Sequence, residues 1–265
     1  MAVLIAIPVY NEVNYVRGIL DRVREYADDI LLIDDGSTDG TPGILEELRE
    51  PMNLQIIRHQ TNLGYGRAIA ESFKHASKHG YDWVITMDCD DQHEPAHIPT
   101  FINAIERDDL DIISGSRYLN LDAKTEIAPA DRRAINMTLA NEINDQLGFT
   151  LTDAFCGFKA HRVSAMERIT LTEDGYAFPM QLWAQSAAHK LRVGEIEVDL
   201  IYNDPNRTFG GGLDDSVKRL AHYREVLARE IDRAFASVAA LSGRHAQHSA
   251  QNPAHAGSKS GCRCC

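Results

Sequence analysis

Short apolar runs alternate with longer helical patterns through the first 118 residues of the chain. The apolar runs are nearly continuous, as in strands that helices cover on both faces, and they lie at residues 3–9, 29–35, 54–59, 83–88 and 110–116. The stretches between them have apolar residues at helical spacing, at 13–26, 40–49, 65–79 and 95–107. This alternation predicts an α/β fold, with a doubly wound, mostly parallel sheet and helices on both faces.

Polar residues collect where these predicted strands end. In a doubly wound sheet, ligands bind beyond the carboxyl ends of the strands. Three of the four informative ends carry groups that can hold a nucleotide, a sugar or a metal; the ends read "PVYNE" (8–12), "DDGSTDGT" (34–41), "MDCDDQH" (87–93) and "GSRY" (115–118). We therefore expect a binding site at this edge of the sheet.

The segment "MDCDDQH" gathers three carboxylates, an amide and an imidazole. Neighbouring carboxylates repel one another and are costly to desolvate unless a cation or a donor compensates them. Asp88 and Asp90 could straddle a nucleotide diphosphate and its metal, with the carbonyl oxygen of Gln92 on the same side, because Mg²⁺ and Mn²⁺ prefer oxygen ligands. The alternative is an ordinary turn that caps a helix at Glu94 and Pro95.

Two further segments contain glycines near predicted helix starts. In "DDGSTDGT", Asp34 or Asp35 could bind a base or ribose, whereas a turn and a helix cap explain residues 37–40. In "NLGYGRA" (62–68), the glycines do not fit a dinucleotide fingerprint, which belongs after the first strand. We expect Gly64 and Gly66 to let this helix pack closely against a bound nucleotide or the sheet.

Arginines supply the cations that a phosphate ligand needs. Arg117 follows a strand, and Arg207 lies in a glycine-rich segment that could close over a substrate. Arg132 and Arg133 could hold a second phosphate or could begin a solvated helix face.

The pattern changes after about residue 120. Helices are predicted at 130–147, 178–189 and 214–238, and a strand at 191–201. We interpret these elements as a second half on the same sheet, so that residues 1–239 form one domain. Residues 240–265 are rich in small and polar residues, which predicts a disordered tail.

Composition and charge exclude some classes of partner. The formal net charge of −12 argues against a nucleic-acid partner and against broad adhesion to anionic lipid. The first residues, "MAVLIAIPVY", lack the positive region of a signal peptide, and no apolar run approaches the ~20 residues that span a bilayer. We expect a cytoplasmic protein, with contact only at the inner face of a membrane if it contacts one.

Seven motifs, in this order, resemble those of the inverting family 2 glycosyltransferases, and among them the dolichyl-phosphate (polyprenyl-phosphate) mannose synthase branch. They are "IPVYNE" (7–12), "DDGSTDGT" (34–41), "NLGYGRA" (62–68), "MDCDDQHEP" (87–95), "GSRY" (115–118), "DAFCGFKA" (153–160) and "DPNRTFGG" (204–211). The resemblance implies a glycosyltransferase A-type, Rossmann-like fold. It also implies a nucleotide-sugar-binding half at 1–118 and an acceptor half at 119–239.

The resemblance assigns roles to individual residues. Those around the nucleotide base and ribose are Pro8, Tyr10, Glu12, Ile33 and Asp35. Those at the ribose and diphosphate are Asp88 and the backbone of Cys89. Asp90 and Gln92 would bind a divalent metal, Mg²⁺ or Mn²⁺. Arg117 and Arg207 would contact phosphate, and Arg132 and Asn136 would bind the acceptor phosphate.

The implied reaction is metal-dependent transfer of a hexose with inversion. The resemblance favours mannose, a GDP-linked donor and a polyprenyl phosphate acceptor. The metal at Asp90, aided by Arg117 and Arg207, would neutralise the leaving diphosphate. A phosphate acceptor needs no general base, whereas a hydroxyl acceptor does, and Asp153 is the candidate base.

Three positions depart from the family pattern. Leu213 stands where the closing loop has a lysine, Gln181 where an acidic residue is usual, and Asn136 where a serine is usual. These departures keep other hypotheses open: a glycan or small-molecule hydroxyl as acceptor, or a nucleotide-sugar-binding protein without turnover. A sugar-1-phosphate nucleotidyltransferase is less compatible, because "PVYNEVNY" (8–15) has neither the glycine nor the lysine of a phosphate loop.

Overall fold

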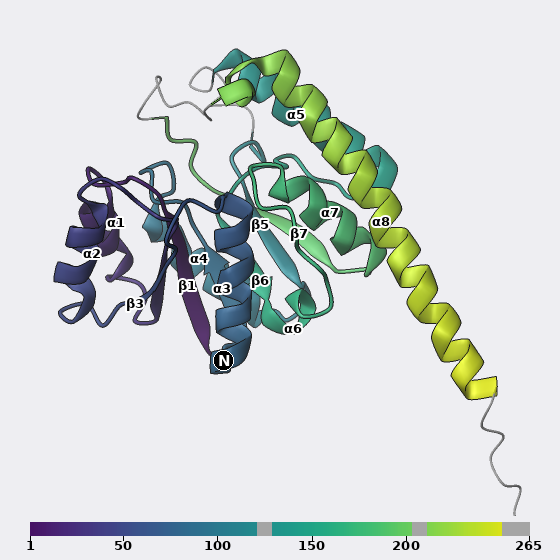
Figure 1. Ribbon diagram of the computed structural model, residues 1–265, viewed down its shortest axis with the longest axis horizontal. Coiled ribbons are helices and arrows are strands. Elements are labelled where there is room, and N and C mark those ends of the chain that lie inside the picture. The colour runs from purple at the N-terminus through teal and green to yellow at the C-terminus, as the bar shows by residue number, and fades with distance from the viewer. Residues whose placement is uncertain (121–128, 203–210, 251–265) are drawn as a thin grey trace, which may run out of the picture.

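The computed structural model describes residues 1–120, 129–202 and 211–250 (Figure 1). Within these residues, seven strands form one sheet in the order β3-β2-β1-β4-β6-β5-β7. The strands are β1 (Val3–Val9), β2 (Ile30–Asp34), β3 (Gln55–Arg58), β4 (Trp83–Thr86), β5 (Ile112–Ser116), β6 (Lys159–Arg162) and β7 (Val193–Glu197). Strand β6 pairs antiparallel with β4 and β5, and the other pairs are parallel. The predicted mostly parallel sheet is therefore confirmed.

Helices cover both faces of the sheet, as predicted (Figure 1). The helices are α1 (Val16–Val23), α2 (Thr41–Arg49), α3 (Tyr65–His79), α4 (Ile98–Glu106), α5 (Ala130–Leu147), α6 (Val163–Met166), α7 (Phe178–Ala188) and α8 (Ser216–Ala250), with 3₁₀ turns η1 (Pro95–His97) and η2 (Gly211–Asp214). The apolar faces of α1, α2 and α4 share one core cluster. Those of α3, α5, α7 and α8 share the other.

Strand β1 shows why the apolar runs are continuous. Its side chains alternate between the two faces, so Ile5 and Ile7 pack in the core of α1, α2 and α4, whereas Leu4 and Ala6 pack in the core of α3 and α5. All four side chains are buried. A strand with helices on both sides therefore needs apolar residues at every position.

The second half of the chain adds β6 and β7 to the same sheet. Strand β7 is shorter than the predicted 191–201, and the sequence analysis did not predict β6. Strand β6 reads "KAHR", and its polar side chains Lys159 and His161 are nevertheless buried. A polar four-residue strand carries neither the apolar run nor the alternation by which strands are recognised.

Helix α8 is longer than predicted. It continues to Ala250 instead of ending near 238, so residues 240–250, which we expected to be disordered, are helical. Figure 1 shows its C-terminal part standing clear of the body of the protein. The rest of the predicted tail, 251–265, and the segments 121–128 and 203–210 lie outside the described residues. In the part of the chain that is described, no helix has both the length and the apolar character needed to cross a bilayer.

Candidate active site

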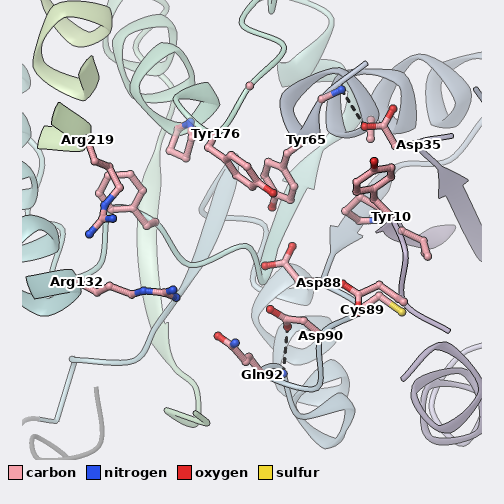
Figure 2. Close-up of a pocket in the computed structure, with 18 of the residues that line it drawn as sticks. Tyr10, Asp35, Tyr65, Asp88, Cys89, Asp90, Gln92, Arg132, Tyr176 and Arg219 are labelled. Carbon is pink, nitrogen blue, oxygen red and sulfur yellow. Dashed lines mark hydrogen bonds between the residues drawn. The ribbon is translucent and has the colours of Figure 1, made fainter. Parts of the chain in front are cut away.

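A cavity of about 650 Å³ lies at the carboxyl ends of β1, β2 and β4 and continues toward α5 and α8 (Figure 2). The predicted site residues that line it are Pro8, Tyr10, Glu12, Asp35, Asp88, Cys89, Asp90, Gln92, Arg117, Arg132 and Asn136. We call one part the carboxylate side, formed by Tyr10, Glu12, Asp35, Asp88, Asp90 and Gln92. We call the other part the arginine side, formed by Arg132, Arg219, Tyr118, Tyr202 and Tyr223.

The loop after β4 brings Asp88, Asp90 and Gln92 together on the carboxylate side (Figure 2). The backbone N–H of Asp88 donates to Nδ1 of His93 at 2.9 Å, and that of Gln92 donates to Oδ1 of Asp90 at 3.1 Å. Burial lowers the pKa of His93 to about 4, so its imidazole is neutral at pH 7 and can accept this bond. Local hydrogen bonds therefore fix the loop.

The segment "MDCDDQHEP" divides into residues that line the cavity and residues that form the predicted capping turn. Asp88 and Asp90 line the cavity, whereas Asp91 pairs with Arg22 of α1. The backbone of Asp91 has a positive φ of 58°. Arg22 also pairs with Glu94 at 3.1 Å, and the Glu94 side chain accepts the N–H of Ala96 to cap η1. The capping turn thus begins where the cavity-lining carboxylates end.

The carboxylate of Asp88 lies against a glycine whose role the sequence analysis did not identify. A Cβ at Gly157 would lie 2.4 Å from Oδ2 of Asp88, so only glycine leaves room for the carboxylate in this position. On its other side is Tyr65, whose pKa is raised well above its usual value by burial and then by the charge and hydrogen bond of Asp88. The one available signal was the glycine in "DAFCGFKA" (153–160).

Asp90 and Gln92 fit a hard divalent cation. One carboxylate and one amide carbonyl supply oxygen ligands, which Mg²⁺ and Mn²⁺ prefer. Among the described residues, no group of three or more histidine, cysteine, aspartate or glutamate side chains could enclose a metal by itself. A metal here would complete its coordination with substrate phosphates and water, which is the usual arrangement for Mg²⁺.

Asp35 lines the cavity, but its oxygens are engaged with the protein. Oδ1 accepts from Nδ1 of His59 at 2.6 Å and from the N–H of Leu63 at 2.8 Å, and Oδ2 accepts from the N–H of Gly64 at 2.8 Å. Burial alone would lower the pKa of His59, but the hydrogen bonds and charges of Asp35 and Glu71 outweigh it and raise the pKa. Asp35 thus holds the loop at 62–64 that forms one wall of the cavity.

Ile33 is not at the cavity, contrary to the role that the resemblance implied for it. Its side chain is 0% exposed and packs in the core shared with α3, where neighbouring side chains cover it. Of the two neighbours predicted for Gly64 and Gly66, the sheet is wrong. A Cβ added at these positions would lie 2.2 and 2.1 Å from the carbonyl oxygens of Asp174 and Glu173, and Gly64 also lines the cavity.

Arg117 is held by the buried carboxylate of Asp153. Its Nε donates to Oδ2 of Asp153 at 2.6 Å, and its terminal nitrogen donates to Oδ1 at 2.9 Å. Oδ1 also accepts the N–H groups of Phe155 and Cys156, both at 3.1 Å. Burial alone would raise the pKa of Asp153, but Arg117 more than compensates and the pKa falls to about 2.

Asp153 is therefore not placed to act as a general base, and the expectation that it takes a proton from an acceptor is wrong. Its side chain is 0% exposed and does not line the cavity, and a carboxylate with a pKa near 2 is a weak base. Its contacts instead orient Arg117, which does line the cavity.

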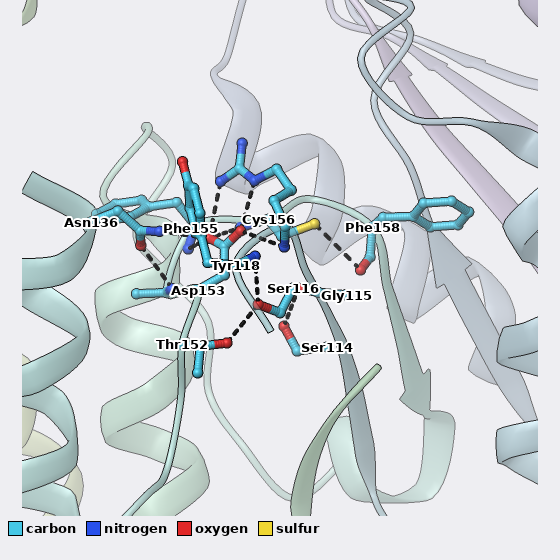
Figure 3. Close-up of polar contacts among 12 residues, drawn as sticks. Ser114, Gly115, Ser116, Tyr118, Asn136, Thr152, Asp153, Phe155, Cys156 and Phe158 are labelled. Atoms are coloured by element: carbon cyan, nitrogen blue, oxygen red, sulfur yellow. Dashed lines mark hydrogen bonds and ion pairs between the residues drawn. The ribbon is translucent and has the colours of Figure 1, made fainter. Parts of the chain in front are cut away.

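Asn136 also belongs to the support of Asp153. Its Nδ2 donates to Oδ1 of Asp153 at 3.2 Å, and its Oδ1 accepts the N–H of Ala154 at 2.9 Å (Figure 3). It lines the cavity, but its amide joins two segments of the protein. The serine that is usual at this position has a shorter side chain with one hydroxyl, and it could not make both contacts in this geometry.

The arginine side combines a predicted residue with an unpredicted one. Arg132 of α5 lies over the ring of Tyr202, at 5.5 Å from its guanidinium carbon to the ring centroid. Arg219 of α8 is 3% exposed and lines the same cavity. No sequence pattern singles out Arg219, because an arginine in a helix is most often on a solvated face. Arg133 does not line the cavity.

Two predicted positions remain, Arg207 and Gln181. Arg207 falls in the segment outside the described residues. Gln181 is buried in α7 and outside the cavity; its Oε1 accepts the N–H groups of Thr172 and Glu173, and its Nε2 donates to Glu230 of α8 at 2.7 Å. The amide at position 181 thus connects α7 to α8.

The fold and this cavity define a glycosyltransferase of the A type. Residues 4–170 match the family described as "Glycosyl transferase family 2", and the chain belongs to that family. The undecaprenyl-phosphate mannosyltransferase of Micrococcus luteus is 28% identical over 84% of this chain and 94% of its own length. The UDP-N-acetylglucosamine–dolichyl-phosphate N-acetylglucosaminyltransferase of Methanococcus voltae is 27% identical over 76% of this chain and 86% of its own.

A solved structure supports the same fold. Glucosyl-3-phosphoglycerate synthase from Mycobacterium tuberculosis, in complex with Mn²⁺, uridine diphosphate and glucosyl-3-phosphoglycerate, superimposes with a TM-score of 0.61. The match covers 88% of this chain and 80% of that one, at 15% sequence identity. The expected glycosyltransferase A-type fold and the resemblance to the polyprenyl-phosphate mannose synthases are confirmed.

Proposed function

We propose that this protein transfers a hexose from a nucleotide sugar to the phosphate of a polyprenyl phosphate, with a divalent metal and with inversion at the anomeric carbon. The observation that carries the proposal is one cavity with carboxylates on one side and two arginines on the other. The names of the two relatives share a lipid phosphate acceptor but differ in the sugar. They support the acceptor class more strongly than the identity of the sugar. The first candidate for the donor is GDP-mannose.

The donor lies on the carboxylate side. Tyr10, with Pro8 and Glu12, faces the nucleotide base, while Asp88 and the Cys89 backbone lie at the ribose and diphosphate. Asp90 and Gln92 hold Mg²⁺ or Mn²⁺, a proposal that the Mn²⁺ and uridine diphosphate in the related solved structure support in kind. When bound, the metal acts as a Lewis acid and a template for the diphosphate.

The acceptor approaches from the arginine side, opposite the diphosphate, which accounts for inversion. A phosphate acceptor is already anionic at pH 7, so no side chain has to remove a proton. The burial of Asp153 behind Arg117 agrees with this chemistry, because it leaves that carboxylate in a structural role. An acceptor with a polyprenyl chain implies contact with a membrane surface during catalysis.

The test is a matrix of donors and acceptors. The donors are GDP-mannose, UDP-glucose and UDP-N-acetylglucosamine, and the acceptors are geranyl phosphate and the uncharged alcohol geraniol, each with Mn²⁺ or with EDTA. We expect release of nucleoside diphosphate with one donor, dependent on metal and on the phosphate acceptor. Equal turnover with geraniol would contradict the acceptor class, and donor binding without turnover in any combination would indicate a non-catalytic nucleotide-sugar-binding protein.

A further inference from the structure

Arg219 is a buried guanidinium that connects α8 to two other segments. One terminal nitrogen donates to the backbone carbonyl of Leu213 in η2 at 2.7 Å. The other terminal nitrogen donates to Oδ2 of Asp131 in α5 at 2.8 Å. The guanidinium of Arg219 is therefore held in place near the first turn of α5, which carries Arg132.

Arg219 and Arg132 line one wall of the cavity, across from Asp88 and Asp90 (Figure 2). Tyr223 of α8 lines the same wall, and burial raises its pKa to about 12, so its hydroxyl stays protonated and can donate a hydrogen bond. The carboxylate that pairs with Arg219 is that of Asp131, which is 49% exposed, so solvent screens its charge. Two cations and a hydroxyl thus face a cavity in a protein whose net charge is −12.

We propose that Arg219, with Arg132, forms the site for the phosphate group of the acceptor. Guanidinium groups bind phosphate oxygens bidentately, and two of them can share one phosphomonoester dianion. The inference deepens the proposed function, on which the identity of the phosphate as an acceptor rests. The phosphate site itself can be measured without sugar transfer.

The first experiment measures the dissociation constant of geranyl phosphate by calorimetry without donor. We expect Arg219→Gln to weaken binding roughly 10- to 100-fold, because a charge-assisted hydrogen-bonded pair is lost. Arg219→Lys keeps the charge but not the planar fork, and it should recover part of the affinity. Binding of geraniol, and the thermal stabilisation by Mn²⁺ with GDP-mannose, should not change.

The control variant is Arg224→Gln, on the same helix. Arg224 pairs with Glu142, is half-exposed and does not line the cavity. This variant removes the same charge from α8, so it should leave the affinity for geranyl phosphate within about twofold, since an exposed charge outside the cavity is screened by solvent. Equal weakening by both variants would assign the effect to net charge and would overturn the proposal.

A second variant is expected to change the affinity for geranyl phosphate in the opposite direction. Asp131→Asn removes the negative charge beside Arg219 but leaves the guanidinium in place, so geranyl phosphate should bind several-fold more tightly. If Arg219 only ties α5 to α8, this variant lowers the melting temperature without tightening phosphate binding. Asp131→Asn therefore tests whether Arg219 binds the phosphate even if Arg219→Gln does not fold.

The results separate this inference from the proposed function. Absence of sugar transfer with every donor, together with phosphate binding that depends on Arg219, would refute the function and leave the phosphate site intact. Unchanged geranyl phosphate binding in folded Arg219→Gln would overturn the inference, whatever the turnover. The inference would also be overturned if Arg219→Gln lost the thermal stabilisation by Mn²⁺ with GDP-mannose but kept its affinity for geranyl phosphate. Arg219 would then bind the donor diphosphate.

Discussion

The two sides of the cavity are built in different ways. The carboxylate side consists of loops that directly follow the parallel strands β1, β2 and β4. On the arginine side, Arg132 and Arg219 lie in the first turns of α5 and α8, and the Asp131–Arg219 pair that joins these helices spans 88 positions in the sequence. One side thus depends on local backbone geometry, and the other depends on how distant helices pack on the sheet.

This difference predicts where substitutions act. On the carboxylate side, His93 and Arg22 hold the loop after β4 through a hydrogen bond and an ion pair, so a change of one cavity-lining side chain should alter chemistry without unfolding the protein. On the arginine side, positions are maintained by buried polar contacts around Asp153 and Gln181. Changes there should reduce stability first and activity as a consequence.

The largest expected effect is that of Asp153→Asn, which tests the support of the arginine side. Asparagine keeps the shape but leaves Arg117 without its buried counter-charge, and breaking a buried pair in this way costs about 3–5 kcal/mol. Urea titration followed by circular dichroism measures the loss. A fall of less than about 1 kcal/mol, the usual value for an exposed pair, would show that Asp153 does not organise this region.

The same residue gives a pH dependence. The pKa of Asp153 in the folded protein is about 2, below the ordinary value of 3.8, so its contribution to stability is complete above pH 4 and is lost as the pH falls toward 2. That shift corresponds to roughly 2 kcal/mol of unfolding free energy. Between pH 4 and pH 2 the wild type should therefore lose more stability than Asp153→Asn, and parallel curves for the two proteins would contradict the assignment.

Next in size is Asp90→Asn on the carboxylate side. We expect kcat to fall about 10²- to 10³-fold, as for the loss of one group that stabilises developing charge, with little change in the melting temperature. The matched control is Asp91→Asn in the same loop, because Asp91 pairs with Arg22 and does not line the cavity. Similar losses in both variants would point to the loop as a whole and not to Asp90 as a ligand.

Gly157→Ala would move the Asp88 carboxylate without removing its charge. The new Cβ would lie 2.4 Å from the Asp88 carboxylate, so that carboxylate must move, and we expect activity to fall on the order of 10- to 100-fold. Gly43→Ala in α2 is the control, because nothing lies within 4 Å of its Cβ, and it should be neutral or slightly stabilising. Full activity in Gly157→Ala would mean that the position of Asp88 does not matter.

The contrast between the two sides also explains what the sequence could predict. Strand ends follow from apolar runs, and the carboxyl ends of parallel strands meet at one edge, so Asp88, Asp90 and Gln92 could be found from their positions. The pattern does not show how completely its neighbours cover a strand residue, and Ile33, which is fully buried and does not line the cavity, was therefore misplaced. Arg219 and Gly157 could not be selected, because their importance depends on contacts with Asp131 and Asp88, which are distant from them in the sequence.

Gln181→Glu is expected to have the smallest effect, and it examines the link between α7 and α8. A second carboxylate would then face Glu230, whose side chain is 1% exposed and lies 2.7 Å from Nε2 of Gln181. One of the two must bind a proton, so its pKa rises and the variant loses stability as the pH increases. We expect a loss of about 1–3 kcal/mol at pH 8 and a smaller one at pH 5, measured by thermal melts at both values. The exchanged pair, Gln181→Glu with Glu230→Gln, restores one amide and one carboxylate and should recover most of the loss. If the double variant is as unstable as the single one, the contact between α7 and α8 depends on packing and not on this hydrogen bond.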